Sequence, residues 1–86
     1  MGDVRLRAGA VEWRQVEGEI VALDLDSSEY LAINRSGTAI WPLLADGATR
    51  EDLAIHLAQE YGIERSAAEH DVGAFLDVLS ERGLLE

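Results

Sequence analysis

The stretch Glu29–Leu44 constrains the fold more than any other part of this chain, because it reads as a strand that runs directly into a helix. The aromatic and β-branched residues at its start favour a pleated strand. Asn34 and Ser36 follow, and their side-chain oxygens can accept the free N–H groups of a helix start. Apolar residues from Ile40 to Leu44 then recur at helical spacing. We expect the strand to have a free edge, and that edge to be the working part of the protein.

The size and composition of the chain favour one small globular domain over residues 1–86. Hydrophobic residues make up 48% of the chain, too many for a disordered protein. No apolar run approaches the roughly 18 residues of a transmembrane helix, and residues 1–10 lack the apolar block of a signal peptide. We therefore expect a cytoplasmic protein with no membrane partner. Residues 1–10 are weakly patterned and are expected to be flexible.

The charge of the chain is strongly one-sided. Seven basic and seventeen acidic residues give a net charge of −10, and lysine is absent. Such a surface repels nucleic acid and anionic lipid, and it speeds encounter with a neutral or basic partner. A simpler interpretation, that acidity keeps a small domain in solution, accounts equally well for most of this charge.

Three short segments with apolar alternation and tight links predict an antiparallel meander. They are Val11–Val16, Glu19–Leu25 and Glu29–Ile33. On the second segment we expect Val21, Leu23 and Leu25 to lie on one face. On the third, Leu31 and Ile33 are expected to face inward, with Tyr30 and Ala32 on the opposite side. The third segment then pairs on one side only.

Three helices are predicted after the meander. The first covers residues 36–45, and Pro42 within it predicts a kink or an early end. The second starts at Thr49, where Asp52 completes an imperfect capping box. The third starts with a capping box at Ser66–Glu69. Its core stripe is Val72, Phe75, Leu76 and Leu79, and a second stripe beside it is Asp71, Ala74, Val78 and Arg82.

The residues that carry chemistry form no catalytic pattern. Cysteine is absent, and the two histidines, His56 and His70, fall on separate predicted helices. No spacing indicates a metal site, and the missing lysine excludes Schiff-base chemistry. Capping accounts for Ser36 and Ser66. We therefore expect a protein that is not an enzyme and that uses no cofactor and no metal.

The predicted order of elements is an α+β, winged helix-turn-helix-like fold, a three-stranded antiparallel sheet followed by three helices. Folds of this kind often read DNA with one helix. The third helix would have to do so here, but acidic residues in or beside it would face the phosphates. No nucleic-acid partner is therefore expected, and a DNA-binding regulator remains only a weak alternative.

The chain resembles the PqqD family, the recognition elements that bind leader peptides of ribosomally made, modified peptides. The resemblance runs from about Val11 to Leu85, in the segments EIVALDLDSSEYLAINRSGTAIWPLLADGAT, REDLAIHLAQEYGI and HDVGAFLDVLSERGLLE. The family pattern has a Leu-Asn-like pair, a Thr/Ser-Gly turn and an Ile-Trp helix, which here are Ile33-Asn34, Ser36-Gly37 and Ile40-Trp41. Its size and Trp41 resemble the stand-alone lasso-peptide versions. Departures are Ile33, where leucine is commoner, and Pro42.

The resemblance implies that a precursor leader peptide adds as a strand beside the third predicted strand and lies between it and the last helix. The expected peptide-binding residues are Glu29, Tyr30, Leu31, Ala32, Ile33, Asp71, Ala74, Phe75 and Val78. Asp71 and Glu29 are expected to meet a basic leader residue, and Ala74 to leave room for a side chain. The resemblance also implies delivery of the precursor to a leader peptidase or another modifying enzyme. A self-associating module, for example a homodimer through the same edge, is the alternative.

Overall fold

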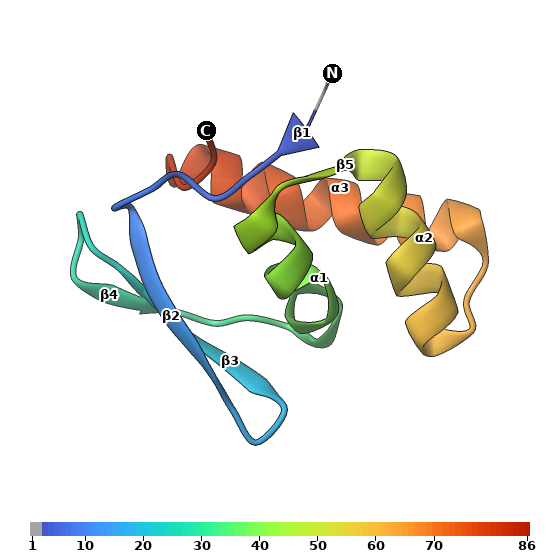
Figure 1. Ribbon diagram of the computed structural model, residues 1–86, viewed down its shortest axis with the longest axis horizontal. Helices are drawn as coiled ribbons and strands as arrows, with labels where there is room; N and C mark the ends of the chain where they lie inside the picture. The colour runs from blue at the N-terminus through green and yellow to red at the C-terminus, as the bar shows by residue number, and fades with distance from the viewer. Residues whose placement is uncertain (1–2) are drawn as a thin grey trace.

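The computed structural model describes residues 3–86, and it confirms the expected order of a three-stranded antiparallel sheet followed by three helices. The strands of this sheet are β2 (Val11–Val16), β3 (Glu19–Asp24) and β4 (Glu29–Leu31). The helices are α1 (Arg35–Asp46), α2 (Arg50–Tyr61) and α3 (Arg65–Glu81). The sheet lies to one side of the helices, and α3 crosses the molecule behind α1 and α2 (Figure 1).

Strand β4 lies at an edge of the sheet, whose order is β2-β3-β4. It pairs with β3 in the register Ala22–Leu31, Leu23–Tyr30 and Asp24–Glu29. No other strand within residues 3–86 pairs with β4. The predicted free edge is therefore present, but β4 ends at Leu31, so Ala32 and Ile33 lie in the link to α1 and not in the strand.

The face that β3 turns to the core is the one opposite to Val21 and Leu23. The structure buries Ile20, Ala22 and Asp24, whereas Val21 and Leu25 are exposed. Both alternating sets contain apolar residues, so alternation alone does not choose between them. Burial of Asp24 is tolerated because its carboxylate accepts the backbone N–H groups of Asp26 and Ser27 at 3.0 and 3.3 Å.

The predicted N-terminal caps are present in two of the three helices. Asn34 caps α1, and Thr49 caps α2 in a full capping box with Asp52. Helix α3 instead begins at Arg65 after Glu64, which makes no side-chain cap bond, so the predicted capping box at Ser66 is wrong. The early end predicted at Pro42 is also wrong, because α1 continues to Asp46.

The N-terminal segment packs against the rest of the domain from residue 3 onward, within the region where the sequence predicted flexibility. Strand β1 (Asp3–Val4) pairs with β5 (Ala48–Thr49), an interaction that the sequence did not indicate. Leu6 is buried and bridges to Leu85 near the C-terminus, and Ala10 is buried as well. The first two residues lie outside the described part of the chain.

The core is organised around Trp41, which is fully buried in the middle of α1. Its ring lies edge-on to Trp13 of β2 at 6.2 Å between centroids, and to Phe75 of α3 at 6.1 Å. Such edge-to-face pairs stabilise beyond the burial of their area. The three rings therefore join the sheet, α1 and α3.

Candidate functional site

A hollow of about 240 Å³ lies between α3 and the link from β4 to α1, and we call it the groove. Its walls are Ala32, Asn34, Ser36, Asp71, Ala74, Phe75 and Val78. Five of the nine residues expected at a peptide-binding site, Ala32, Asp71, Ala74, Phe75 and Val78, therefore line one hollow.

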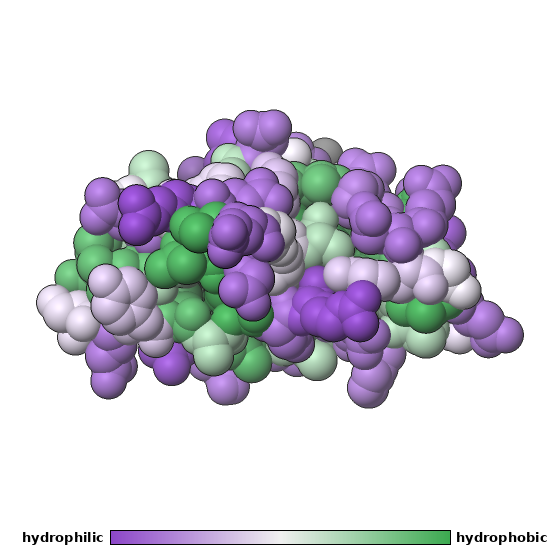
Figure 2. Space-filling view, turned by 90° about the horizontal axis from the view of Figure 1, so that it is seen from below, coloured by the Kyte–Doolittle hydropathy of each residue, from purple (hydrophilic) through white to green (hydrophobic). Residues whose placement is uncertain are grey.

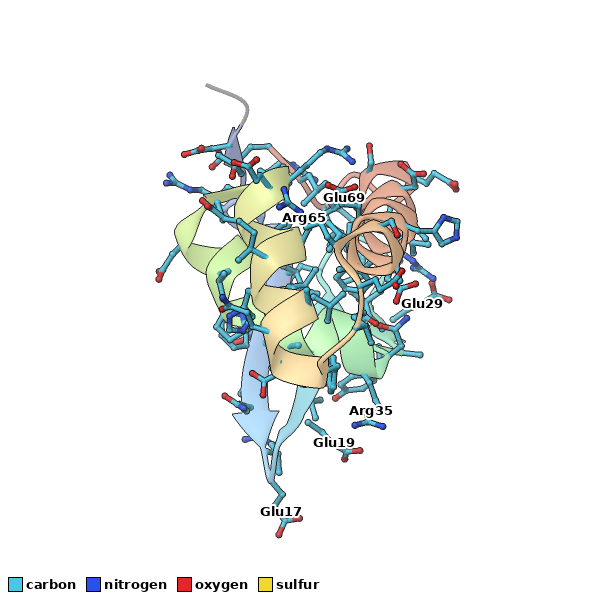
Figure 3. The ribbon with its side chains drawn as sticks, turned by 90° about the vertical axis from the view of Figure 1, so that its right-hand side faces the viewer. Glu17, Glu19, Glu29, Arg35, Arg65 and Glu69 are labelled. Carbon is cyan, nitrogen blue, oxygen red and sulfur yellow. The ribbon has the colours of Figure 1, made fainter. Side chains whose placement is uncertain are left out.

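The other four expected residues lie along the edge of the sheet and do not line the groove. Leu31 and Ile33 are half-buried and pack against the core, as predicted. Tyr30 points to the outer face of the sheet and is 73% exposed. Glu29 is exposed at the start of β4, and in Figure 3 it lies on the same side of the molecule as α3 and Arg35. Of these four residues, Glu29, Tyr30 and Leu31 form β4, and Ile33 lies in the link that follows it.

The floor of the groove is the ring of Phe75, which is 7% exposed. The ring packs against the first turn of α1, where a Cβ built on Gly37 would lie only 2.5 Å from its Cε1 atom. The N–H of Gly37 donates to Asn34 Oδ1 at 2.7 Å, so the capped turn is held in place. Glycine at residue 37 thus allows α1 to approach the ring closely.

The walls divide into an apolar and a polar side. Ala74, Phe75 and Val78 come from α3, and Val78 is 53% exposed although apolar. Asn34 and Ser36 supply polar atoms from the start of α1. Sequence reasoning assigned both residues to capping alone. Their position directly after the edge strand is the signal that could have added them to the site.

The two acidic residues expected to meet a basic leader residue differ in their surroundings. Glu29 already faces Arg82, with Oε1 4.0 Å from Nη1, and the same guanidinium lies 3.8 Å from Asp24 Oδ2. Asp71 is half-buried, and it makes no ion pair or side-chain hydrogen bond with any residue from 3 to 86. The unpaired carboxylate at the groove is therefore that of Asp71.

The outer face of the sheet carries a second hollow of about 270 Å³, on the far side of β4 from the core. Its walls are Glu12, Trp13, Arg14, Val21, Leu23 and Tyr30. In the space-filling view, hydrophobic side chains gather over the half of the molecule where the ribbon places the sheet (Figure 2). The sheet therefore presents apolar side chains that the core does not use.

The remaining reactive side chains are dispersed. His56 lies 3.8 Å from Glu60 on the same helix, and His70 is exposed on α3. Within the described part of the chain, no three metal-ligating side chains come together. No helix there is both long and apolar enough to span a bilayer.

Comparison with known proteins gives matches over most of the chain. The family model for coenzyme PQQ synthesis protein D (PqqD) matches residues 19–85. A solved structure of TbiB1 in complex with the TbiA(beta) leader peptide is 30% identical, with a TM-score of 0.84, over 95% of this chain and 94% of that chain. A lasso peptide synthetase B1 complexed with the leader peptide is 35% identical, with a TM-score of 0.80, over 96% of each chain. Among curated proteins there is no significant match.

Proposed function

Because the chain belongs to the PqqD family, we propose that it is a lasso-type recognition element that binds the leader region of a ribosomally made precursor peptide. In this proposal the leader adds as a strand to β4 and places side chains in the groove, and the protein then delivers the precursor to a leader peptidase or another modifying enzyme. The observation that carries the proposal is the groove itself, which is lined by Ala32, the residue that directly follows the edge strand β4.

Strand addition fits this surface for two physical reasons. An unpaired edge offers backbone donors and acceptors to any extended chain, and native proteins normally protect such edges with charge or proline. Within β4, Glu29 at the start is the only charged residue, Tyr30 and Leu31 are uncharged, and none of the three is proline. Backbone pairing by itself tolerates many sequences, so the side chains that enter the groove supply selectivity. The apolar wall formed by Phe75, Ala74 and Val78 favours an apolar side chain there.

The two similar structures support the choice of ligand. Each is a complex with a leader peptide, and each protein aligns with this chain over nearly its whole length. The same fold is thus compatible with leader binding without any further domain in those chains. A peptide that becomes ordered on binding loses entropy, so we expect a dissociation constant of about 1 μM or somewhat lower.

Delivery requires a second surface that stays free while the leader is bound. The outer face of the sheet meets this requirement, because its hollow and the groove share no lining residue. Val21 and Tyr30 are exposed there at 39% and 73%. We propose that the processing enzyme docks on this face, since an apolar centre within an acidic surface suits an apolar partner with a neutral or basic rim.

The groove is tested by filling it. Ala74→Trp should occupy the hollow and weaken binding of the cognate leader about tenfold or more, because a side chain that can no longer be buried loses roughly 1.5–3 kcal/mol. Ala67→Trp is the matched control, since Ala67 is also an exposed alanine of α3 but does not line the groove. A fluorescently labelled leader and an anisotropy titration measure both affinities, and circular dichroism verifies that each variant is folded.

A second measurement locates the peptide. Amide chemical shifts on addition of leader should cluster at residues 29–33 and 71–78. Shifts confined to α2, or full affinity of a folded Ala74→Trp variant, would show that the leader binds elsewhere. Self-association through β4 would instead give a dimer in sedimentation that leader peptide does not dissociate.

A further inference from the structure

The groove continues into a neighbouring hollow of about 380 Å³, which we call the Tyr61 hollow. Its walls are Arg35, Ser36, Tyr61, Ile63 and Asp71. Ser36 and Asp71 line the groove as well. The two hollows are therefore adjacent, and a chain that leaves one past Asp71 enters the other.

The floor of the Tyr61 hollow is held in place by the domain. The Tyr61 hydroxyl donates to the backbone carbonyl of Arg35 at 3.1 Å, which fixes the ring against the start of α1. Ile63 is half-buried and packs against the core. The floor thus offers an aromatic ring and an aliphatic side chain that the rest of the protein leaves partly uncovered.

The walls of this hollow carry one cation, Arg35, and one carboxylate, Asp71. The Arg35 guanidinium lies 5.0 Å from the centroid of the Tyr61 ring, so the ring face already supports one cation. Asp71 supplies the carboxylate at the boundary of the two hollows and has no partner among the residues that the structure describes. Arg35 is exposed.

The direction of the bound peptide follows from the sheet. Both strand pairs of the three-stranded sheet are antiparallel, and antiparallel pairs are slightly more stable than parallel ones. An added antiparallel strand has its N-terminal end beside the C-terminal end of β4, where the chain continues through Ala32 to Ser36. Because β4 has three residues, it spans only about 10 Å, so the peptide soon runs past it.

We propose that the Tyr61 hollow is a second subsite of the groove and that it takes a basic side chain from the residues immediately N-terminal to the segment paired with β4. The aliphatic stem of an arginine or lysine would lie on Ile63 and Tyr61, and its charged end would pair with Asp71. This assignment rests on the proposed peptide-binding function and adds to it the chemistry of one recognised residue.

Selection from a phage-displayed library of random short peptides tests the assignment without knowledge of the natural leader. Wild-type protein, Asp71→Asn and Asp77→Asn are each used as bait. Asp77→Asn is the matched control, because it removes one negative charge from an exposed position of α3 that lines neither hollow. Wild type and Asp77→Asn should enrich arginine or lysine N-terminal to an apolar segment, and Asp71→Asn should not.

The peptide that wild-type protein enriches most strongly is then used to measure how much the basic residue contributes to binding affinity. Replacing its basic residue with methionine should weaken binding about fivefold, and Asp71→Asn should weaken binding by a similar factor. The two changes together should weaken binding little more than either change alone, because both remove the same ion pair. Arg35→Gln removes a competing cation and should leave the affinity equal or higher.

Three results would overturn the assignment of the second subsite. Wild-type protein could enrich peptides without a basic residue, or Asp71→Asn and Asp77→Asn could lose the preference for a basic residue equally. Lower affinity in Arg35→Gln would indicate an acidic ligand. Failure of the proposed function itself is distinguishable. In that case no peptide is enriched, or the enriched peptides bind equally well when Ala74→Trp fills the groove.

Discussion

Two glycine-to-alanine substitutions in helices should change the stability of this protein in opposite directions. Gly37 lies in the first turn of α1 and Gly73 in the middle of α3. In both places alanine favours the helix, by up to about 1 kcal/mol in a helix interior. A Cβ on Gly73 would meet no atom within 4 Å, so only this gain remains there. Gly73→Ala should therefore raise the free energy of unfolding by about 1 kcal/mol.

At residue 37 a steric cost opposes the same gain. The added Cβ would lie 2.5, 2.6 and 3.0 Å from three ring atoms of Phe75. That ring also packs edge-on against Trp41, so it relieves the clash by moving toward the empty groove. Such overpacking costs about 1–3 kcal/mol. After the helix gain is subtracted, Gly37→Ala should lower the free energy of unfolding by up to about 2 kcal/mol.

Urea unfolding, followed by tryptophan fluorescence and by far-ultraviolet circular dichroism, measures both variants. The expected separation between them is about 1–3 kcal/mol, and in a domain of this size each kcal/mol shifts the melting temperature by about 4–8 °C. Gly37→Ala should also weaken leader binding, because Phe75 moves into the groove. If Gly37→Ala is as stable as Gly73→Ala, the ring is not confined as described and the account of the groove floor is wrong.

Further predictions concern the cap of α1, the buried carboxylate, nucleic acid and catalysis. Asn34→Ala should cost about 1 kcal/mol in urea unfolding, whereas Asn34→Asp should retain the cap; equal losses would contradict the capping role. Asp24→Ala should cost about 1–3 kcal/mol because two backbone N–H groups lose their acceptor, whereas Asp26→Ala should cost about 0–1 kcal/mol. Duplex DNA should show no saturable binding in an anisotropy titration at physiological salt, given the net charge of −10. Mass spectrometry should find the precursor unchanged by the purified chain alone and processed faster when the chain is added to its enzyme.

Local sequence signals determined most of the fold. The alternation in Val11–Val16 predicts β2 with the bounds that the structure has. Thr49 with Asp52 predicts the start of α2, because capping depends on residues that are close in the sequence. The stripe that contains Phe75 predicts the buried face of α3 in the same way. The motif from Ile33-Asn34 to Ile40-Trp41 also indicated the PqqD family, and the match of the family model to residues 19–85 shows that the chain belongs to it.

Contacts between segments far apart in the sequence decided the rest. Both alternating sets of β3 contain apolar residues, and the inward choice of Ile20 and Ala22 arises only when the helices cover one face of the sheet. Burial of Asp24 likewise depends on the turn that follows it and on Arg82 near the end of the chain. Pairing of the N-terminal β1 with β5 has no local signal, because two residues are too few to show a period.

The groove was determined partly by local sequence signals and partly by contacts between segments far apart in the sequence. Periodicity alone placed Ala74 and Val78 on a second stripe of α3, beside the core stripe. It could not show that Tyr30 turns away from that stripe, or that Asp71 stands between two hollows, because both depend on how α3 lies across the sheet and the start of α1. A repeat in the sequence specifies which residues share a face, whereas the packing of elements distant in the chain specifies what each face meets.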